Sequence, residues 1–261
     1  MEPVIDLHCH VLPGIDDGPA TIEGSVALAR AAAADGTRVL VGTPHVSSRY
    51  PNEPESIARG VEELNMRLAA EGIALEVRGG AELAMTRLVE MQATEIRRFA
   101  LGGGEWLLVE CPLSSASMGF DILVLDLQRR GHRVLLAHPE RCPAFHREPH
   151  VLEALVSAGA LTSITAGALA GRFGDQVRRF ALRLVRDGMA HSVASDAHDH
   201  LRRPPTMKTD LEAAGLRPLV DWLTEKVPGA ILDGHEIPPR PGIAIPIAEQ
   251  APRSRWRLRR G

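Results

Sequence analysis

Short apolar runs alternate with longer amphipathic stretches along most of the chain. The apolar runs predict strands at residues 3–8, 38–43, 74–79, 105–110, 133–137, 161–165 and 190–195. Between them, apolar residues recur with helical spacing and predict helices at 21–35, 54–71, 84–98, 119–130, 148–158 and 175–187. Strands that alternate with helices are typical of a parallel sheet with helices packed outside it.

Glycines mark where most of the predicted helices end. Each follows a helical run and precedes a strand, as a helix C-terminal glycine does: Gly36, Gly72, Gly131, Gly159 and Gly188. Nothing resembling a domain linker separates the seven units, so a closed or nearly closed barrel is favoured over an open, doubly wound sheet. We expect residues 1–240 to form this body, with residues 241–261 as a proline-containing strap and a basic, partly disordered tail.

Composition narrows the class of partner. The formal net charge of −3 and the aromatic content of 3% give no reason to expect nucleic acid as the partner. The N-terminus lacks the pattern of a signal peptide, and no apolar run is long enough for a transmembrane segment. Three cysteines without a CxxC pair are typical of a reducing compartment, so we expect a cytoplasmic protein.

Imidazole and carboxylate side chains follow six of the seven predicted strands. These candidate ligands are His8, His10, Asp16 or Asp17, His45, Glu82, Glu110, His138, Asp196 and His198. The strands of a parallel barrel open with their carboxyl ends on one face, so we expect these side chains to converge. The two histidines of the H-x-H pair point to the same side of their strand and could bind one ion.

The donor set predicts a cluster of divalent metals. Any one of these residues is more often an ordinary polar side chain, but so many acidic and imidazole groups together need cations to balance them. Imidazole and carboxylate without thiolate suit Mn²⁺, Fe²⁺ or Zn²⁺. Nine donors exceed the needs of one ion, so we expect two or three. Ions about 3.5–4 Å apart can clamp a phosphate and acidify a water.

Two arginines follow ligand motifs closely enough to contact a phosphate. Arg141 follows His138 in AHPER, and Arg203 follows His198 in SDAHDHLRRPP. A guanidinium can bind phosphate oxygens in a bidentate manner. Arg202 competes with Arg203 for this role, and the sequence does not separate them. His198, already named as a candidate metal ligand, could also help to protonate the leaving group of the substrate.

A cysteine-dependent phosphatase mechanism is excluded by inspection. It requires Cys-x5-Arg, in which the arginine and loop amides activate the thiol and hold the phosphate. The residues six positions after Cys9, Cys111 and Cys142 are Ile15, Ser117 and Glu148.

Several motifs together resemble one known family. DLHCHVLPGIDDGP, TPHV, GAEL, LLVECP, AHPER, AGALAGRFG and ASDAHDHLRRPP occur in this order over roughly residues 4–240. They resemble the polymerase-and-histidinol-phosphatase (PHP) superfamily, and within it the CpsB-like protein-tyrosine phosphatases of capsule and exopolysaccharide loci. The resemblance implies a distorted (β/α)7 barrel with a trinuclear centre, usually manganese, at the carboxyl ends of the strands.

The resemblance also implies residue roles. His8, His10, Glu82 and Asp196 would hold a first metal, Glu82, Glu110 and His138 a second, and Asp17, His45 and His198 a third. Arg141 and Arg203 would contact phosphate. The implied substrate is phosphotyrosine protein, and the resemblance suggests the tail of a tyrosine autokinase for polysaccharide export as one such protein. The alternatives are a histidinol-phosphate, small-molecule or nucleotide phosphoesterase, and a non-catalytic metal-binding barrel.

The sequence departs from the family pattern at three places. Cys9 stands where relatives often have serine, and we expect it to point away from the ligands. The sixth strand carries Ser163 and Thr165 where glutamine and asparagine are common, which leaves the substrate preference open. The basic RSRWRLRRG tail is not a family feature, and the oligomeric state is not predicted.

Overall fold

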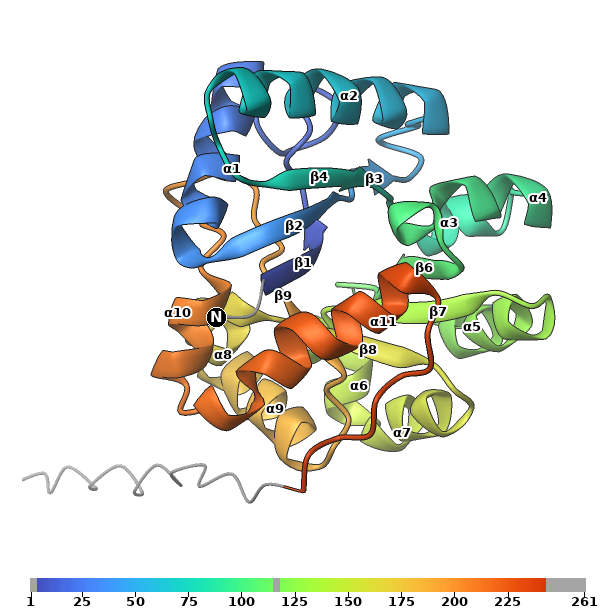
Figure 1. Ribbon diagram of the computed structural model, residues 1–261. Coiled ribbons are helices and arrows are strands. Elements are labelled where there is room, and N and C mark those ends of the chain that lie inside the picture. The colour runs from blue at the N-terminus through green and yellow to red at the C-terminus, as the bar shows by residue number, and fades with distance from the viewer. Residues whose placement is uncertain (1–3, 115–117, 243–261) are drawn as a thin grey trace, which may run out of the picture.

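A parallel barrel with helices outside it forms the body of the protein (Figure 1). The computed structural model describes residues 4–114 and 118–242. Within these ranges the strands are β1 (Val4–Cys9), β2 (Thr37–Gly42), β3 (His45–Val46), β4 (Glu76–Gly79), β5 (Glu82–Leu83), β6 (Trp106–Glu110), β7 (Arg133–Ala137), β8 (Leu161–Thr165) and β9 (Ser192–Ala194). All seven predicted strands are confirmed, and the two additional strands, β3 and β5, are two residues long.

The strands form two sheets that join into a ring. One sheet has the order β1-β2-β4 and the other β3-β5-β6-β7-β8-β9, with parallel pairing throughout. β3 and β5 continue the directions of β2 and β4 after short interruptions, and the Glu82 N–H donates to the Pro44 carbonyl across that gap at 3.1 Å. On the other side, a bridge between Cys9 and Ala197 joins β1 to the segment after β9. The expected distorted (β/α)7 barrel is confirmed.

Helices cover the outside of this ring. Those that follow strands are α1 (Ile22–Asp35), α2 (Pro54–Ala70), α3 (Met85–Leu88), α4 (Ala93–Ile96), α5 (Phe120–Arg129), α6 (Pro143–Arg147), α7 (Pro149–Ser157), α8 (Ala166–Leu169), α9 (Asp175–Arg186) and α10 (Met207–Ala213). A π-helical turn (Trp222–Lys226) leads into α11 (Val227–Asp233), and both pack against β1. Gly36 ends α1 in the left-handed conformation with φ 110°, as predicted.

The helix predicted at 84–98 is wrong as a continuous element. α3 ends at Leu88, and α4 begins again at Ala93 before a 3₁₀ turn at Arg97–Phe99. The Glu95 carboxylate accepts a hydrogen bond from the Gln92 N–H at 2.8 Å, which caps a new helix start and interrupts the earlier one. The short helices α6, α8 and α10 and the closing π–α11 segment were not predicted, because each is too short or irregular to show a clear period.

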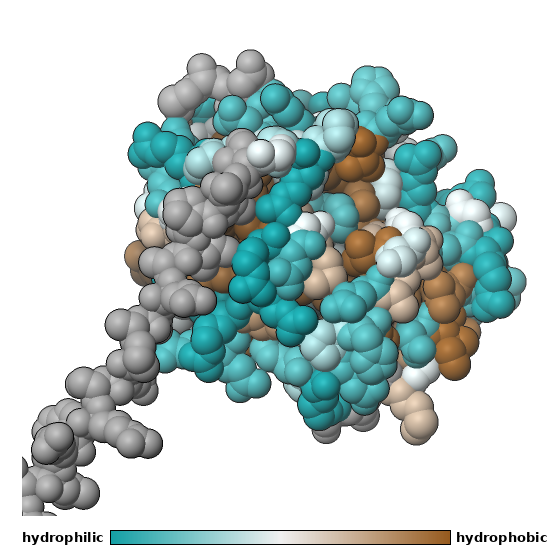
Figure 2. Space-filling view, turned by 90° about the horizontal axis from the view of Figure 1, so that it is seen from below, coloured by the Kyte–Doolittle hydropathy of each residue, from teal (hydrophilic) through white to brown (hydrophobic). Residues whose placement is uncertain are grey.

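A single apolar core fills the space inside the barrel and beneath the helices. The strands carry most of it: Leu107, Leu108 and Val109 of β6 are all fully buried. The face seen in Figure 2 is mainly hydrophilic, with separate apolar patches between polar side chains. No described helix is long and apolar enough to cross a membrane.

Residues 235–242 leave α11 and run along the outside of the body (Figure 1). The Trp222 indole N–H donates to the Pro238 carbonyl at 3.1 Å, which anchors this segment. The rest of the predicted strap and the basic tail, residues 243–261, lie outside the described residues. The division of the chain at residue 240 therefore stays a prediction.

Candidate metal centre

All nine predicted ligand side chains lie in one continuous cluster at the carboxyl ends of the strands. Parallel pairing brings these ends to one rim, and the donors come from β1, β3, β5, β6 and the segments after β1, β7 and β9. Each donor lies close to at least one other through ion pairs or as a possible joint ligand. β8, which corresponds to the sixth predicted strand, carries neither an imidazole nor a carboxylate side chain.

The fully buried Glu82 carboxylate occupies the middle of the cluster. Its Oε1 lies 2.7 Å from His138 Nε2, and its Oε2 lies 2.9 Å from His45 Nδ1. Burial alone would raise the pKa of Glu82, yet the nearby His8 and hydrogen bonds from surrounding histidines hold it well below its usual range. The site therefore keeps an ionised carboxylate in the interior, where it needs positive charge around it.

Four donor atoms surround one point beside Glu82. His8 Nε2 and His10 Nε2 are 3.2 Å apart, and each lies 3.4 Å from Glu82 Oε2. The same two nitrogens lie 3.6 and 3.5 Å from Asp196 Oδ1. Ligands about 2.1 Å from a tetrahedral ion are separated by about 3.4 Å, so these spacings suit a shared cation.

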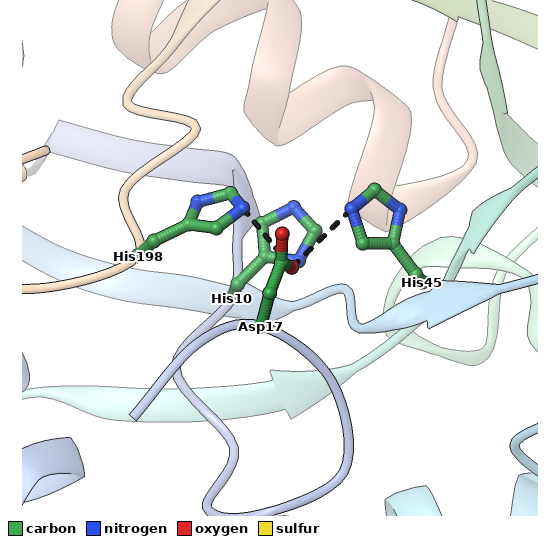
Figure 3. Close-up of side chains that lie close together, drawn as sticks. All are labelled: His10, Asp17, His45 and His198. Atoms are coloured by element: carbon green, nitrogen blue, oxygen red, sulfur yellow. Dashed lines mark ion pairs between the residues drawn. The ribbon is translucent and has the colours of Figure 1, made fainter. Parts of the chain in front are cut away.

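A second group of donors lies next to the first (Figure 3). Asp17 Oδ1 lies 3.5 Å from His45 Nε2 and 3.4 Å from His198 Nε2, with His10 beside them. The Asp17 side chain is 46% exposed, whereas His198 is buried, so this group faces the open side of the cluster.

Asp16 and Asp17, which spacing could not separate, have different surroundings. Asp16 lies behind His10: its Oδ2 accepts from His10 Nδ1 at 2.7 Å and from the His45 backbone N–H at 3.1 Å. Its Oδ1 accepts from the Gly18 N–H at 2.9 Å. Because Nδ1 is directed at this carboxylate, a neutral His10 keeps its proton on Nδ1 and presents the lone pair of Nε2 to the cluster, the usual arrangement behind a metal-binding histidine.

Glu110 forms a further group of possible ligands with His45 and Glu82. Burial and the charge of Glu82 raise the pKa of Glu110 to about 7. For a histidine, burial acts in the other direction and would lower the pKa of His10. Hydrogen bonds to Asp16, Asp196 and Glu82 nevertheless raise it well above its ordinary range. Both shifts reflect too little positive charge among packed carboxylates, and divalent cations would correct this imbalance.

Asp196 forms the border between the donor cluster and the two arginines. Its Oδ1 faces His8 and His10, while its Oδ2 accepts from Arg141 Nη1 at 2.6 Å and from Arg203 Nη2 at 2.7 Å. Arg203 Nη2 also donates to the Asp196 carbonyl at 3.0 Å. Arg203 is thus the arginine held at the cluster, whereas the exposed Arg202 side chain lines an adjoining pocket.

Two site residues adopt a strained backbone. Among the described residues other than glycine, only His138 (φ 37°) and Asp196 (φ 50°) have positive φ. Such conformations cost about 1–3 kcal/mol each and persist where the surrounding structure imposes them. The strain turns both side chains into the cluster directly after their strands end, which supports a functional rather than a structural role.

Sequence reasoning missed Tyr50 and Phe173, and it named Asp16 only as an alternative ligand. Asp16 orients His10, the Tyr50 ring stacks on the His45 ring at 5.8 Å, and the Phe173 ring lies 4.5 Å below the Arg141 guanidinium. Only Asp16 left a signal, as the other half of the DDG motif. Cys9 is fully buried and its Sγ lies 3.6 Å from the Ala197 carbonyl, so it points away from the ligands as expected.

Comparisons with known proteins agree with this geometry. Residues 4–215 match the family model for capsular polysaccharide synthesis, CpsB/CapC. The chain is 39% identical over 197 residues to the tyrosine-protein phosphatase YwqE of Bacillus subtilis, covering 75% of this chain and 78% of the relative. It is 32% identical over 208 residues to the putative tyrosine-protein phosphatase CapC of Staphylococcus aureus, covering 78% and 81%.

A solved structure shows the same architecture. The match is to a structure from work on YwqE of Bacillus subtilis and CpsB of Streptococcus pneumoniae, described as unique metal-dependent tyrosine phosphatases. Its TM-score is 0.81 with 36% sequence identity, and the alignment covers 92% of this chain and all of the other. The chain therefore belongs to the CpsB/CapC family of capsular polysaccharide synthesis proteins.

Proposed function

We propose that this protein is a metal-dependent protein-tyrosine phosphatase that hydrolyses phosphotyrosine. The observation that carries the proposal is the single cluster of nine donors with two guanidinium groups on its border, formed around an ionised, buried Glu82. Such a cluster suits phosphoryl transfer, which depends mainly on positioning and on stabilising charge. The names of the relatives support the same activity.

The ligand assignment divides the donors into three sets, of which the first two share Glu82. His8, His10, Glu82 and Asp196 would hold a first ion, Glu82, Glu110 and His138 a second, and Asp17, His45 and His198 a third. We propose two to three ions, with Mn²⁺ first, since mixed imidazole and carboxylate donors suit it; Fe²⁺ and Zn²⁺ have overlapping preferences. When bound, such ions supply Lewis-acid charge to the phosphoryl group and acidify a water.

Arg141 and Arg203 would bind the phosphoryl oxygens of the substrate. Their shared acceptor, Asp196 Oδ2, fixes the two guanidinium groups side by side and leaves their other N–H groups free to donate. Phe173 supports Arg141 from below through its ring face. Fixed donors aimed at developing charge stabilise a transition state without reorganisation at the moment of reaction.

His198 fits a ligand better than a proton donor. Its Nδ1 lies 3.1 Å from the Asp196 carbonyl, which can only accept, so Nδ1 carries the ring proton. Burial lowers the pKa of His198, which keeps the ring neutral and Nε2 unprotonated. The phenolate of tyrosine is a good leaving group, because the pKa of its conjugate acid is about 10. Its proton can therefore come from solvent.

The setting of the enzyme is also a proposal. We propose a cytoplasmic enzyme of capsule or exopolysaccharide synthesis that acts on a phosphotyrosine protein, for example the tail of a tyrosine autokinase. The family description supports the pathway, and three free, buried cysteines suit a reducing compartment.

A substrate panel tests the proposal. With Mn²⁺, the protein should hydrolyse phosphotyrosine peptides much faster than phosphoserine peptides, histidinol phosphate or nucleotides. A preference for histidinol phosphate or a nucleotide by orders of magnitude would instead identify a small-molecule phosphoesterase of the same fold. No hydrolysis of any phosphate ester would favour a non-catalytic barrel.

A further inference from the structure

A small pocket adjoins the donor cluster and shares Asp196 with it. It is lined by Thr165, Gly167, Arg172, Phe173, Ser195, Asp196, Arg202, Arg203 and Pro204. Its volume is about 80 Å³, several times the roughly 10–15 Å³ that one water needs. Because Asp196 and Arg203 belong to both the pocket and the phosphate border, a group bound here would lie next to the phosphoryl group.

The arginines of this pocket differ in how they are engaged. Arg172 donates to both oxygens of the buried Asp210, so a carboxylate balances its charge. Arg203 is bonded to Asp196. Arg202, in contrast, is exposed and its guanidinium forms no ion pair with any residue of the described chain. Burial would raise the pKa of Asp199 in the same loop, but the backbone hydrogen bonds that its carboxylate accepts and the charge of Arg202 lower it. The pocket therefore has one guanidinium outside any direct ion pair of the described residues.

Other contacts fix the loop that carries Arg202. The Asp199 carboxylate accepts from the backbone N–H groups of Leu201 and Arg202 at 2.7 and 2.5 Å. The His198 N–H donates to the Arg203 carbonyl at 3.2 Å, which closes the same loop onto the donor cluster. The backbone beneath Arg202 is thus held, and only its side chain is free to reach a ligand.

Small residues at the end of β8 and after β9 create the space for a ligand. Thr165 and Ser195 form part of the wall with short hydroxyl side chains. A Cβ added at Gly167 would lie 2.7 Å from Arg172 Nε, so only glycine allows Arg172 to lie against this wall. The wall combines apolar surface from Phe173 and Pro204 with three arginines, and the pocket is too small for an aromatic ring to enter fully.

We propose that this pocket binds the carboxylate of an aspartate or glutamate next to phosphotyrosine, with Arg202 as the residue that selects it. The inference rests on the proposed phosphotyrosine activity and adds a preference for acidic flanking sequence. A carboxylate suits an exposed guanidinium outside any ion pair and a volume of a few atoms. Because Arg202 is exposed, salt weakens the preference by screening.

The test compares kcat/KM for three phosphotyrosine peptides with glutamate, alanine or lysine on both sides of the phosphotyrosine. The wild-type enzyme with Mn²⁺ should favour the glutamate peptide over the alanine peptide by about tenfold, equivalent to about 1.4 kcal/mol. Arg202→Gln should bring this ratio close to one. Arg202→Glu should reverse it in favour of the lysine peptide, a gain that a misfolded enzyme cannot show.

Arg129→Glu is the matched control, because Arg129 is an exposed arginine on α5. It should keep the wild-type ratio. An equal fall for all three peptides in Arg202→Glu would show that Arg202 contacts the phosphate itself and would overturn the proposal. So would a wild-type enzyme without acidic preference. Failure of the phosphatase assignment is distinct, since then none of the three peptides would be hydrolysed.

Discussion

Replacing Asp16 by asparagine tests how the donor cluster is oriented. Asp16 Oδ2 accepts a hydrogen bond from His10 Nδ1 at 2.7 Å, so a neutral His10 presents the lone pair of Nε2 to the cluster. The asparagine oxygen can keep one backbone hydrogen bond, but its amide N–H₂ would face His10 Nδ1. His10 would then favour the other tautomer, with its proton on the nitrogen that should bind metal.

The size of the effect follows from the role of such partners. Loss of a carboxylate behind a metal-binding histidine reduces metal affinity about 10- to 100-fold, or about 1.4–2.8 kcal/mol. All nine donors remain in Asp16→Asn, so saturating Mn²⁺ should restore most of kcat. Asp17→Asn removes a donor instead, and it should lower the number of ions bound even at saturation.

The assay is calorimetric titration of metal-free protein with Mn²⁺, run beside phosphotyrosine hydrolysis at increasing Mn²⁺. Asp126→Asn, on the exposed face of α5, serves as the control and should match the wild type. Equal metal affinity in Asp16→Asn and the wild type would refute the orienting role. A lower ion count in Asp16→Asn than in Asp17→Asn would show that the two roles are exchanged.

Three further predictions follow from the same contacts. Glu82→Gln should remove at least one metal equivalent by elemental analysis and abolish hydrolysis, because it takes the charge from the middle of the cluster; unchanged metal content would contradict the ligand assignment. Arg203→Lys should lower kcat/KM about 100-fold with metal content unchanged, since lysine cannot reproduce the guanidinium donors; a loss of metal instead would assign Arg203 a structural role. Burial and the nearby Arg240 lower the pKa of His191 to about 4. The folded state then binds fewer protons than the unfolded state, so stability is present above pH 6.5 and falls as the pH drops toward 4, by up to about 3 kcal/mol. Denaturant unfolding should show this slope in the wild type and a shallower one in His191→Asn, and equal slopes would refute it.

The sequence predicted the barrel well because its signals are local and repeated. Apolar runs of strand length, helical spacing and glycines after helices gave all seven main strands within a few residues. It failed at 84–98, where the Gln92–Glu95 cap divides one apolar pattern into two helices. The two-residue strands β3 and β5 exist only through pairing with their neighbours, and no local pattern encodes such pairing.

The candidate site was partly within reach of sequence reasoning. Position after a strand end is enough to bring donors to one rim, so the convergence of the nine side chains could be predicted. The difference between Asp16 and Asp17 depends on how one loop folds back onto His10, which spacing does not contain. Spacing likewise does not separate Arg202 from Arg203. In the structure Arg203 donates to Asp196, whereas Arg202 lines the adjoining pocket.

Chelation and metal return test the central claim most directly. Hydrolysis of a phosphotyrosine peptide should disappear after treatment with EDTA and removal of the chelator, and return with Mn²⁺ in proportion to two or three ions bound per chain. A thiol-alkylating agent should have no effect on the folded enzyme, since all three cysteines are buried. Activity that survives complete removal of metal, or that alkylation abolishes, would contradict the account.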